Sequence, residues 1–178
     1  MAFEALRVIR PLVKVGSRVA PRLTGNLAFR AFCTPPRAAG ISGAQRKLID
    51  RAEARMAEAE RRRIAFEGGE IQAYRFKTAA RRRGVVALIH GWTGRAAFMS
   101  AFVEPLNAAG FDVVALDLPG HGHSSGRTLH VPLGIAALQA LHWEFGPWTG
   151  IVAHSFGGAL ANVLVAGGVP RFPAIAVE

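Results

Sequence analysis

Residues 150–166 read GIVAHSFGGALANVLVA and join three local patterns end to end. The short apolar run Gly150–Ala153 is typical of a strand that is buried on both faces of a sheet. The longer apolar run Phe156–Ala166 has the length of a helix and is followed by two glycines, which commonly end helices. The sequence therefore predicts a strand, a sharp turn with Ser155 at its apex, and a helix.

This layout is typical of a nucleophile elbow, which exposes a hydroxyl on a sharp strand-to-helix turn. Such a turn brings strand and helix close together, so Ala153 and Gly157 need to be small. The backbone N–H of Phe156 would form half of an oxyanion hole, helped by the helix dipole. His154 adjoins Ser155, but neighbours at such a turn point away from each other, so we expect it to support the site and not to act as the base.

A second loop follows the predicted buried strand Gly84–Ile89 and reads His90-Gly91-Trp92-Thr93-Gly94. Gly91 lets the backbone turn sharply and approach a ligand closely. A backbone N–H in this turn is placed to point at a developing oxyanion. The alternative is an ordinary strand-to-helix turn, because glycine is common in any turn.

A third loop, residues 117–126, follows the predicted strand Asp112–Leu116 and reads DLPGHGHSSG. We expect Asp117 to hydrogen-bond N–H groups of its own loop, as carboxylates at turns commonly do. His121 and His123 raise the question of a metal site, but no set of carboxylate partners accompanies them, and we predict no metal. Ligands bind at the carboxyl ends of strands in open α/β sheets, so the three loops should converge on one site.

The remaining patterns complete an alternation of strands and helices. The runs Ile64–Glu67 and Glu70–Phe76 flank Gly-Gly and predict a β-hairpin. Ala97–Ala109 and Leu133–Phe145 have helical patterns, and Ala174–Val177 begins another strand. This order predicts an α/β fold with a mostly parallel sheet and helices on both faces.

The formal net charge of +10 is concentrated in the first part of the chain. Residues 1–83 hold 19 of the 22 lysines and arginines. We predict a basic N-terminal extension over residues 1–40, with one or two short helices, and an amphipathic helix over residues 41–63. Basic segments attract nucleic acid or anionic lipid, but no nucleic-acid-binding motif is present, so we expect an exposed basic face and no nucleic-acid partner.

The sequence leaves two alternatives for what the N-terminal extension contacts. Residues 1–40 either cover part of the domain or make a weak contact with a membrane surface. We favour the first, because Pro11 is expected to break the amphipathic helix that membrane binding requires. The oligomeric state is not predicted.

Nothing in the sequence predicts export or a membrane span. Residues 145–170 carry no charged side chain, but their glycines and prolines divide them into strand, turn and helix. The N-terminus lacks the uninterrupted apolar run of a secretory signal. Cys33 is the only cysteine, so no disulfide forms within the chain. We expect a cytoplasmic protein.

Together, the three loops resemble those of the α/β-hydrolase family, in the same order and at similar separations. The resemblance covers about residues 60–178. By this resemblance Ser155 is the nucleophile, and the backbone N–H groups of Trp92 and Phe156 form the oxyanion hole. His90 and Gly91 would then position the oxyanion loop, and Asp117 would brace its own loop.

The resemblance implies a serine hydrolase of the esterase, lipase or haloperoxidase-like type, without a cofactor. Its substrate would be a small-molecule ester or a related acyl compound, cleaved through an acyl-Ser155 intermediate. A dehalogenase or an epoxide hydrolase, with an aspartate nucleophile, is disfavoured.

The same family places a catalytic acid and a catalytic histidine after the serine. No histidine follows His154, and Glu178 is the only later side-chain carboxylate. Nothing in the sequence orients His121 or His123 as a base. We therefore expect residues 64–178 to be the N-terminal part of the domain, a fragment truncated before the late strands and inactive alone. The alternative is a catalytically inactive remnant, or a half-domain that needs a second polypeptide.

Overall fold

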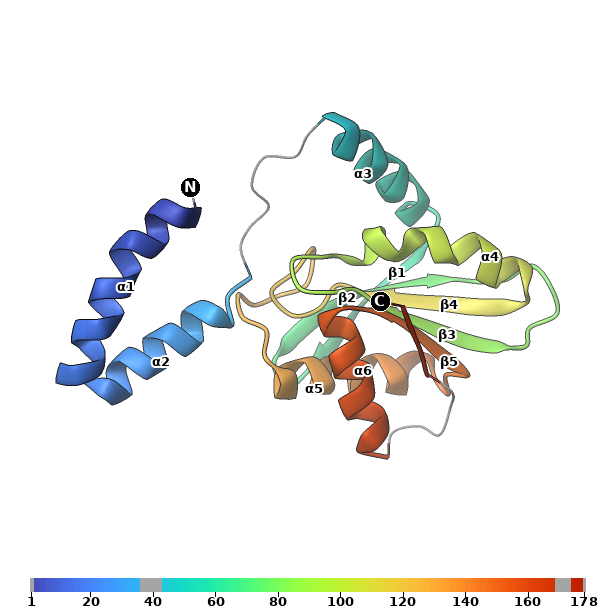
Figure 1. The fold of residues 1–178 in the computed structure, drawn as a ribbon. Helices are drawn as coiled ribbons and strands as arrows, with labels where there is room; N and C mark the ends of the chain where they lie inside the picture. Colours follow the sequence, from blue (N-terminus) through green and yellow to red (C-terminus); the bar gives the residue numbers. More distant parts are fainter. Residues whose placement is uncertain (1, 36–42, 169–173, 178) are drawn as a thin grey trace. The chain divides into compact units, whose positions relative to one another are not determined.

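The chain divides into two compact units, residues 1–34 and residues 35–178. The computed structural model describes residues 2–35, 43–168 and 174–177. The first unit consists of helices α1 (Ala2–Val19) and α2 (Pro21–Phe32), drawn in blue in Figure 1.

The prediction that Pro11 breaks the first helix is wrong, because α1 continues through Pro11. Proline removes one backbone N–H donor from a helix. Pro11 is exposed, so water has access to this part of the helix and can replace the missing donor. The structure thereby removes the reason for preferring a covering role for this segment.

The described residues of the second unit form one six-stranded sheet. Its strands are β1 (Glu60–Phe66), β2 (Gly69–Phe76), β3 (Gly84–Ile89), β4 (Phe111–Leu116), β5 (Gly150–His154) and β6 (Ala174–Val177). The spatial order is β1-β2-β4-β3-β5-β6. β3 pairs in parallel with β4 and β5, and β5 with β6, whereas β2 is antiparallel to both β1 and β4.

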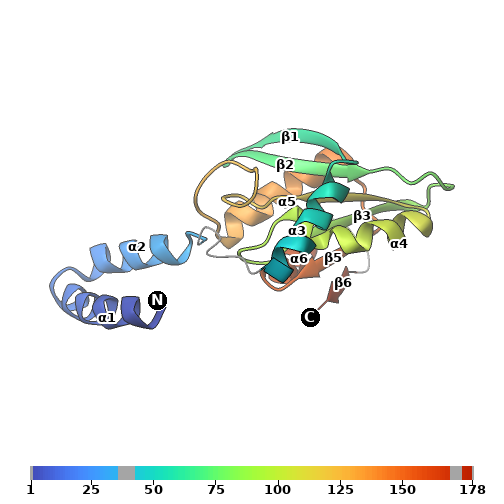
Figure 2. The same cartoon turned by 90° about the horizontal axis from the view of Figure 1, so that it is seen from above.

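Helices cover both faces of this sheet, as Figures 1 and 2 show. The helices on one face are α3 (Gly43–Met56), the 3₁₀ helix η1 (Ala96–Phe102) and α4 (Val103–Ala108), and those on the other are α5 (Val131–Phe145) and α6 (Phe156–Ala166). The predicted α/β architecture, a mostly parallel sheet between helices, is therefore confirmed.

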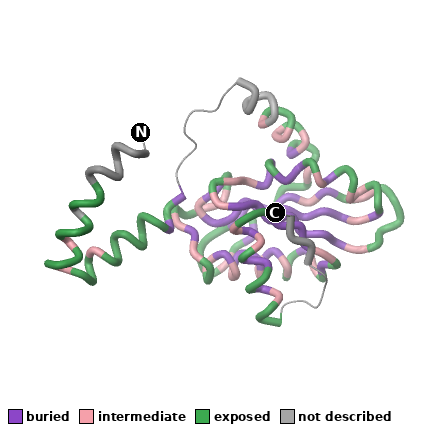
Figure 3. Tube along the Cα trace, viewed as in Figure 1, coloured by how far each residue is buried: buried purple, intermediate pink, exposed green. Residues whose placement is uncertain are grey.

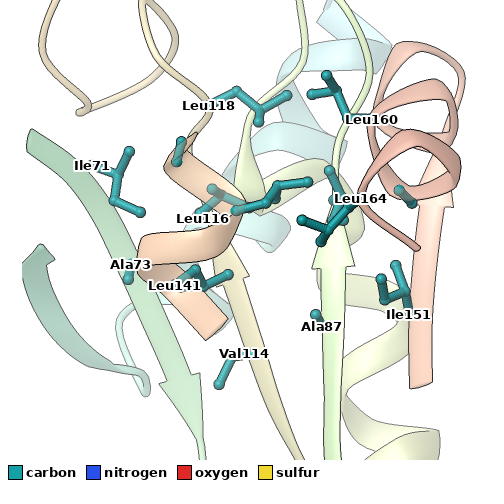
Figure 4. Packing of buried hydrophobic residues seen from close by; sticks show 14 of the residues in the cluster. Ile71, Ala73, Ala87, Val114, Leu116, Leu118, Leu141, Ile151, Leu160 and Leu164 are labelled. Carbon is teal, nitrogen blue, oxygen red and sulfur yellow. The ribbon is translucent and has the colours of Figure 1, made fainter. Parts of the chain in front are cut away.

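Each face of the sheet has its own hydrophobic core, because side chains alternate along a strand. In β3, Ala87 and Ile89 pack with α5 and α6, whereas Leu88 packs with η1. Figure 4 shows the first core, where Leu141 and Leu160 approach the sheet. β3 to β5 are mostly buried (purple in Figure 3), as expected for parallel strands covered on both sides.

The predicted helix over residues 41–63 is too long. α3 ends at Met56, and β1 begins at Glu60, opposite Arg75 of β2. The local charge spacing favours a helix, but pairing with β2 extends the hairpin back to Glu60 and overrides that preference.

The predicted helix Ala97–Ala109 is likewise divided, into η1 and α4. Pro105 lies in the first turn of α4, where its missing N–H costs no helical hydrogen bond. The proline therefore favours the start of a new α-helix, α4, over one uninterrupted helix.

Candidate active site

Ser155 lies at the apex of the turn between β5 and α6 and is exposed. Its backbone angles are φ 50° and ψ −119°. Positive φ is uncommon and strained for a residue with a side chain, and such strain concentrates at functional sites. Among the described residues, none forms a hydrogen bond with Ser155 Oγ. The turn therefore presents an unengaged hydroxyl at the edge of the sheet where β3, β4 and β5 end.

Gly157 makes this sharp turn possible. A Cβ atom on Gly157 would lie 2.5 Å from the carbonyl oxygen of His90 and 2.7 Å from that of Ile89. These are backbone atoms at the end of β3, so a side chain at this position would force helix and strand apart. Gly158 is the contrast, because a Cβ atom there would meet nothing within 4 Å.

Gly91 brings the loop after β3 against the elbow. A Cβ atom on Gly91 would lie 3.0 Å from Ser155 Cβ and 2.8 Å from His154 Nδ1. Only a glycine leaves room for this approach. The exposed His154 thus lies beside the loop, and no described hydrogen bond joins its ring to Ser155.

Trp92 and Phe156, the two residues expected to supply oxyanion-hole N–H groups, lie side by side. Their ring centroids are 5.4 Å apart, with the planes nearly perpendicular at 79°. This edge-to-face geometry is favourable for aromatic pairs. Phe156 is the first residue of α6, where backbone N–H groups have no partner within the helix.

His90 joins two loops of the site through a buried, neutral ring. Its Nε2 accepts a hydrogen bond from the Leu118 N–H at 2.9 Å, and its Nδ1 lies 2.7 Å from the Gly91 carbonyl oxygen. A carbonyl only accepts, so Nδ1 carries the proton. Burial lowers the pKa of His90 to about 4. His90 therefore positions the Gly91 loop, and neither ring nitrogen is available as a base.

His121 has the same arrangement. Its Nε2 accepts from the Thr93 N–H at 3.2 Å, and its Nδ1 lies 3.0 Å from the Pro119 carbonyl oxygen. Burial lowers its pKa below the usual value for histidine. Thr93 has a positive φ of 64°, a strained conformation that this hydrogen bond helps to hold. His121 is thus also a positioning residue.

Asp117 is buried and accepts hydrogen bonds from three elements. Its Oδ1 accepts from the Ala96 N–H at 2.8 Å, and its Oδ2 accepts from the His123 N–H at 2.9 Å and the Tyr74 hydroxyl at 3.1 Å. Burial, then the nearby Asp117 carboxylate, raises the pKa of Tyr74. Asp117 therefore braces the loop after β4 and also anchors η1 and β2.

The ring of His123 is more exposed than those of His90 and His121, although its backbone N–H is held by Asp117. Its side chain is 60% exposed, and its Nδ1 is 3.1 Å from the Tyr74 hydroxyl and 3.5 Å from Asp117 Oδ2. The described residues contain no group of three or more His, Cys, Asp or Glu side chains arranged to hold a metal ion.

A pocket of about 410 Å³ adjoins the elbow. Its lining includes the Gly91 loop, His154 and three apolar side chains of η1, namely Phe98, Met99 and Phe102. Sequence reasoning did not single out these three residues or Tyr74. Their helical and strand patterns reveal only that they lie in regular elements, because the contacts depend on how the elements pack.

Comparison with known proteins places this geometry in a family. A family model described as serine aminopeptidase, S33, matches residues 80–175, which is more than half of the chain. The chain belongs to this family of α/β-hydrolases.

Two curated relatives differ in the reaction that their names describe. A pimeloyl-[acyl-carrier protein] methyl ester esterase of Methylococcus capsulatus is 36% identical over 100 residues, covering 50% of this chain and 39% of the relative. The dihydrolipoyllysine-residue acetyltransferase component of the acetoin cleaving system of Cupriavidus necator is 33% identical over 120 residues, covering 64% of this chain and 31% of the relative. The chain thus spans about a third of the length of these relatives.

Solved structures share the fold. An epoxide hydrolase from Vigna radiata has a TM-score of 0.59 and 20% identity, with 69% of this chain and 41% of that chain covered. The thioesterase domain from the curacin biosynthetic pathway has a TM-score of 0.58 and 27% identity, with 67% of this chain and 46% of that chain covered.

Proposed function

We propose that this chain carries the nucleophile and oxyanion hole of a serine hydrolase that cleaves an ester or related acyl bond. The observation that carries the proposal is Ser155, an exposed serine with positive φ between a parallel strand and a helix. The names of two similar proteins, a methyl ester esterase and a thioesterase domain, support acyl chemistry.

The proposed reaction begins when Ser155 Oγ attacks the acyl carbonyl carbon and transfers its proton to a base. Negative charge then develops on the carbonyl oxygen, where the N–H groups of Trp92 and Phe156 would donate to it. The bond to the leaving alcohol or thiol breaks as that group takes up the proton. Water then hydrolyses acyl-Ser155, which releases the carboxylic acid and restores the serine.

We further propose that the base and its acid lie outside these 178 residues. His90 and His121 each use both ring nitrogens in hydrogen bonds to the backbone. His154 lies beside Gly91, and His123 lies beside Tyr74 and Asp117. None of the six histidine rings, all of which lie within the described residues, forms a hydrogen bond with Ser155 Oγ, so a neighbouring segment or a second polypeptide would complete the site.

Hydrolysis of p-nitrophenyl acyl esters by the product of the whole coding region tests the role of Ser155. We expect turnover that falls by at least about a thousandfold in Ser155→Ala, because removal of a serine nucleophile leaves only the residual effect of the oxyanion hole and binding. Ser17→Ala, a change at an exposed serine of α1, is the control and should leave the rate unchanged. Equal rates in Ser155→Ala and Ser17→Ala would remove Ser155 from the mechanism.

The coding sequence after codon 178 tests the origin of the base. The proposal predicts a continuing frame, in phase or after one shift, that encodes a carboxylate and a histidine in late-strand context. A verified stop without such a frame, together with no turnover by the chain, would favour the alternative of an inactive remnant.

A further inference from the structure

The first unit separates cations from apolar side chains around helix α1. Arg10, Lys14 and Arg18 recur every four residues and therefore lie along one side of the helix. With 3.6 residues per turn, Ile9, Val13 and Val19 fall on the opposite side. All six side chains are exposed, Val19 by 80%. α1 is therefore amphipathic, and its apolar side has no cover within the described residues.

Helix α2 also exposes large apolar side chains. None of its residues is buried, and Leu23, Leu27 and Phe29 are each about 60% exposed. A Cβ atom on Gly16 would lie 2.6 Å from Thr24 Oγ1, so α1 and α2 meet closely at this point. The contact between the helices thus uses small residues and leaves the large apolar side chains outside it.

The charge of this segment is almost entirely positive. Glu4 is the only acidic residue among the first 49. Of the described residues, none forms an ion pair with the exposed cations of the two helices, which are Arg10, Lys14, Arg18, Arg22 and Arg30. An occupant of this surface must therefore offer both negative charge and an apolar layer.

We propose that residues 2–32 bind the surface of an anionic lipid bilayer, with both helices lying in the interface. Helices that lie on membranes carry Lys and Arg on the polar side and apolar residues on the other, as α1 does. The long cationic side chains reach the headgroups while the apolar side chains enter the acyl boundary.

A nucleic acid or a second copy of the chain would match either the charge or the apolar side chains of this surface, but not both. A nucleic acid neutralises the cations but leaves the exposed valines and leucines in water. A second copy of the chain covers the apolar side chains but brings two strongly basic units together, and like charges repel.

The distribution of charge along α1 favours a helix that lies in the interface over one that crosses the bilayer. Arg10, Lys14 and Arg18 mark three successive turns, and a crossing orientation would place charged side chains in hydrocarbon. Within the parts of the chain that the structure describes, no helix has the length and apolar character needed to cross a membrane.

Co-sedimentation of the full chain with vesicles tests this proposal. One set of vesicles contains equal parts of phosphatidylglycerol and phosphatidylcholine, and the other contains phosphatidylcholine alone. Each cation near an anionic surface strengthens binding about fivefold, so the triple change Arg10→Gln, Lys14→Gln, Arg18→Gln should weaken binding to the anionic vesicles on the order of 100-fold. Glutamine favours helices, so circular dichroism should show unchanged helix content.

The matched control removes the same charge from exposed arginines of the second unit, through Arg51→Gln, Arg81→Gln and Arg127→Gln. This variant should bind the anionic vesicles within about threefold of the unchanged chain, because its cations are outside the proposed surface. Equal losses in the two triple variants would overturn the proposal, since they would indicate a net-charge effect.

A second variant isolates the apolar contribution. The changes Ile9→Thr, Val13→Thr and Val19→Thr keep the charge and the β-branched shape but should weaken vesicle binding at least tenfold, because less apolar surface is buried. Unchanged binding in this variant would overturn the interfacial arrangement. So would failure of the unchanged chain to sediment with anionic vesicles while it binds DNA or RNA, or forms dimers that the threonine changes abolish.

Discussion

The Nε2 atom of His90 accepts a hydrogen bond from the Leu118 N–H across 2.9 Å, and this contact joins the loops that follow β3 and β4. The same ring holds the Gly91 carbonyl oxygen through Nδ1. Protonation of Nε2 abolishes its acceptor role, so the geometry of the Gly91 loop depends on a neutral histidine.

Stability should consequently fall at acidic pH. The folded pKa of His90 is about 4, below the ordinary value of 6.5, because burial disfavours the charged ring. Between these values the unfolded chain binds more protons, so the contribution of His90 is present above pH 6.5 and is lost as the pH falls towards 4. We expect His90 to contribute a loss of about 2.5 kcal/mol in the free energy of unfolding, measured by urea denaturation from pH 7.5 to 4.5.

His90→Gln separates this contribution from those of other groups. The variant should be less stable at pH 7.5, and its free energy of unfolding should depend less on pH between 4.5 and 6.5. A dependence equal to that of the unchanged chain would show that His90 is not the group responsible.

Two adjacent glycines should respond oppositely to alanine. Gly157→Ala places a Cβ atom 2.5 Å from the His90 carbonyl oxygen, and we expect a loss of roughly 3 kcal/mol or more in the free energy of unfolding. Gly158→Ala has open space and should gain about 0.5–1 kcal/mol from helix propensity. Chemical denaturation of both variants measures the contrast. Similar losses in both would mean that the close contact between α6 and β3 is absent.

Gly91→Ala should affect the chemistry more than the stability. The added methyl group would press on Ser155 Cβ and His154 Nδ1 and displace the loop that carries the Trp92 N–H. Loss of one oxyanion-hole donor lowers the rate about 100- to 1,000-fold. The rate of fluorophosphonate labelling of the product of the whole coding region measures this, with thermal unfolding as the check on folding. Unchanged labelling would place the oxyanion donor elsewhere.

Asp117 should contribute more to the free energy of unfolding than its hydrogen-bond partner Tyr74. Asp117→Ala leaves three donors without their acceptor, namely the Ala96 N–H, the His123 N–H and the Tyr74 hydroxyl. We therefore expect the free energy of unfolding to fall by about 3–5 kcal/mol. Tyr74→Phe removes only one donor and should cost about 1–2 kcal/mol. Urea denaturation at pH 7.5 compares them. Equal, small losses would contradict the bracing role of the carboxylate.

Much of the sheet could be predicted from the sequence, because parallel strands buried on both faces leave uninterrupted apolar runs. Gly84–Ile89 and Phe156–Ala166 match β3 and α6 to the residue. The start of β1 could not be predicted, since Glu60–Arg63 is polar and becomes a strand only by pairing with β2. Local patterns do not encode that pairing.

The candidate site could likewise be predicted only in part from the sequence. The turns around Gly91 and Ser155 follow from glycine and small-residue patterns, and the strand order then brings their loops together. The hydrogen bond from the Thr93 N–H to His121 joins residues that are 28 positions apart, and the one from the Tyr74 hydroxyl to Asp117 joins residues that are 43 positions apart. Such contacts depend on packing between elements, which a local pattern does not describe.

Mass spectrometry of the fluorophosphonate-treated product of the whole coding region tests the central claim, that Ser155 is the nucleophile, most directly. The account predicts one covalent adduct, located on Ser155 in the peptide that joins β5 to α6, and its absence in Ser155→Ala. An adduct on a different serine, with Ser155 unmodified, would contradict the account.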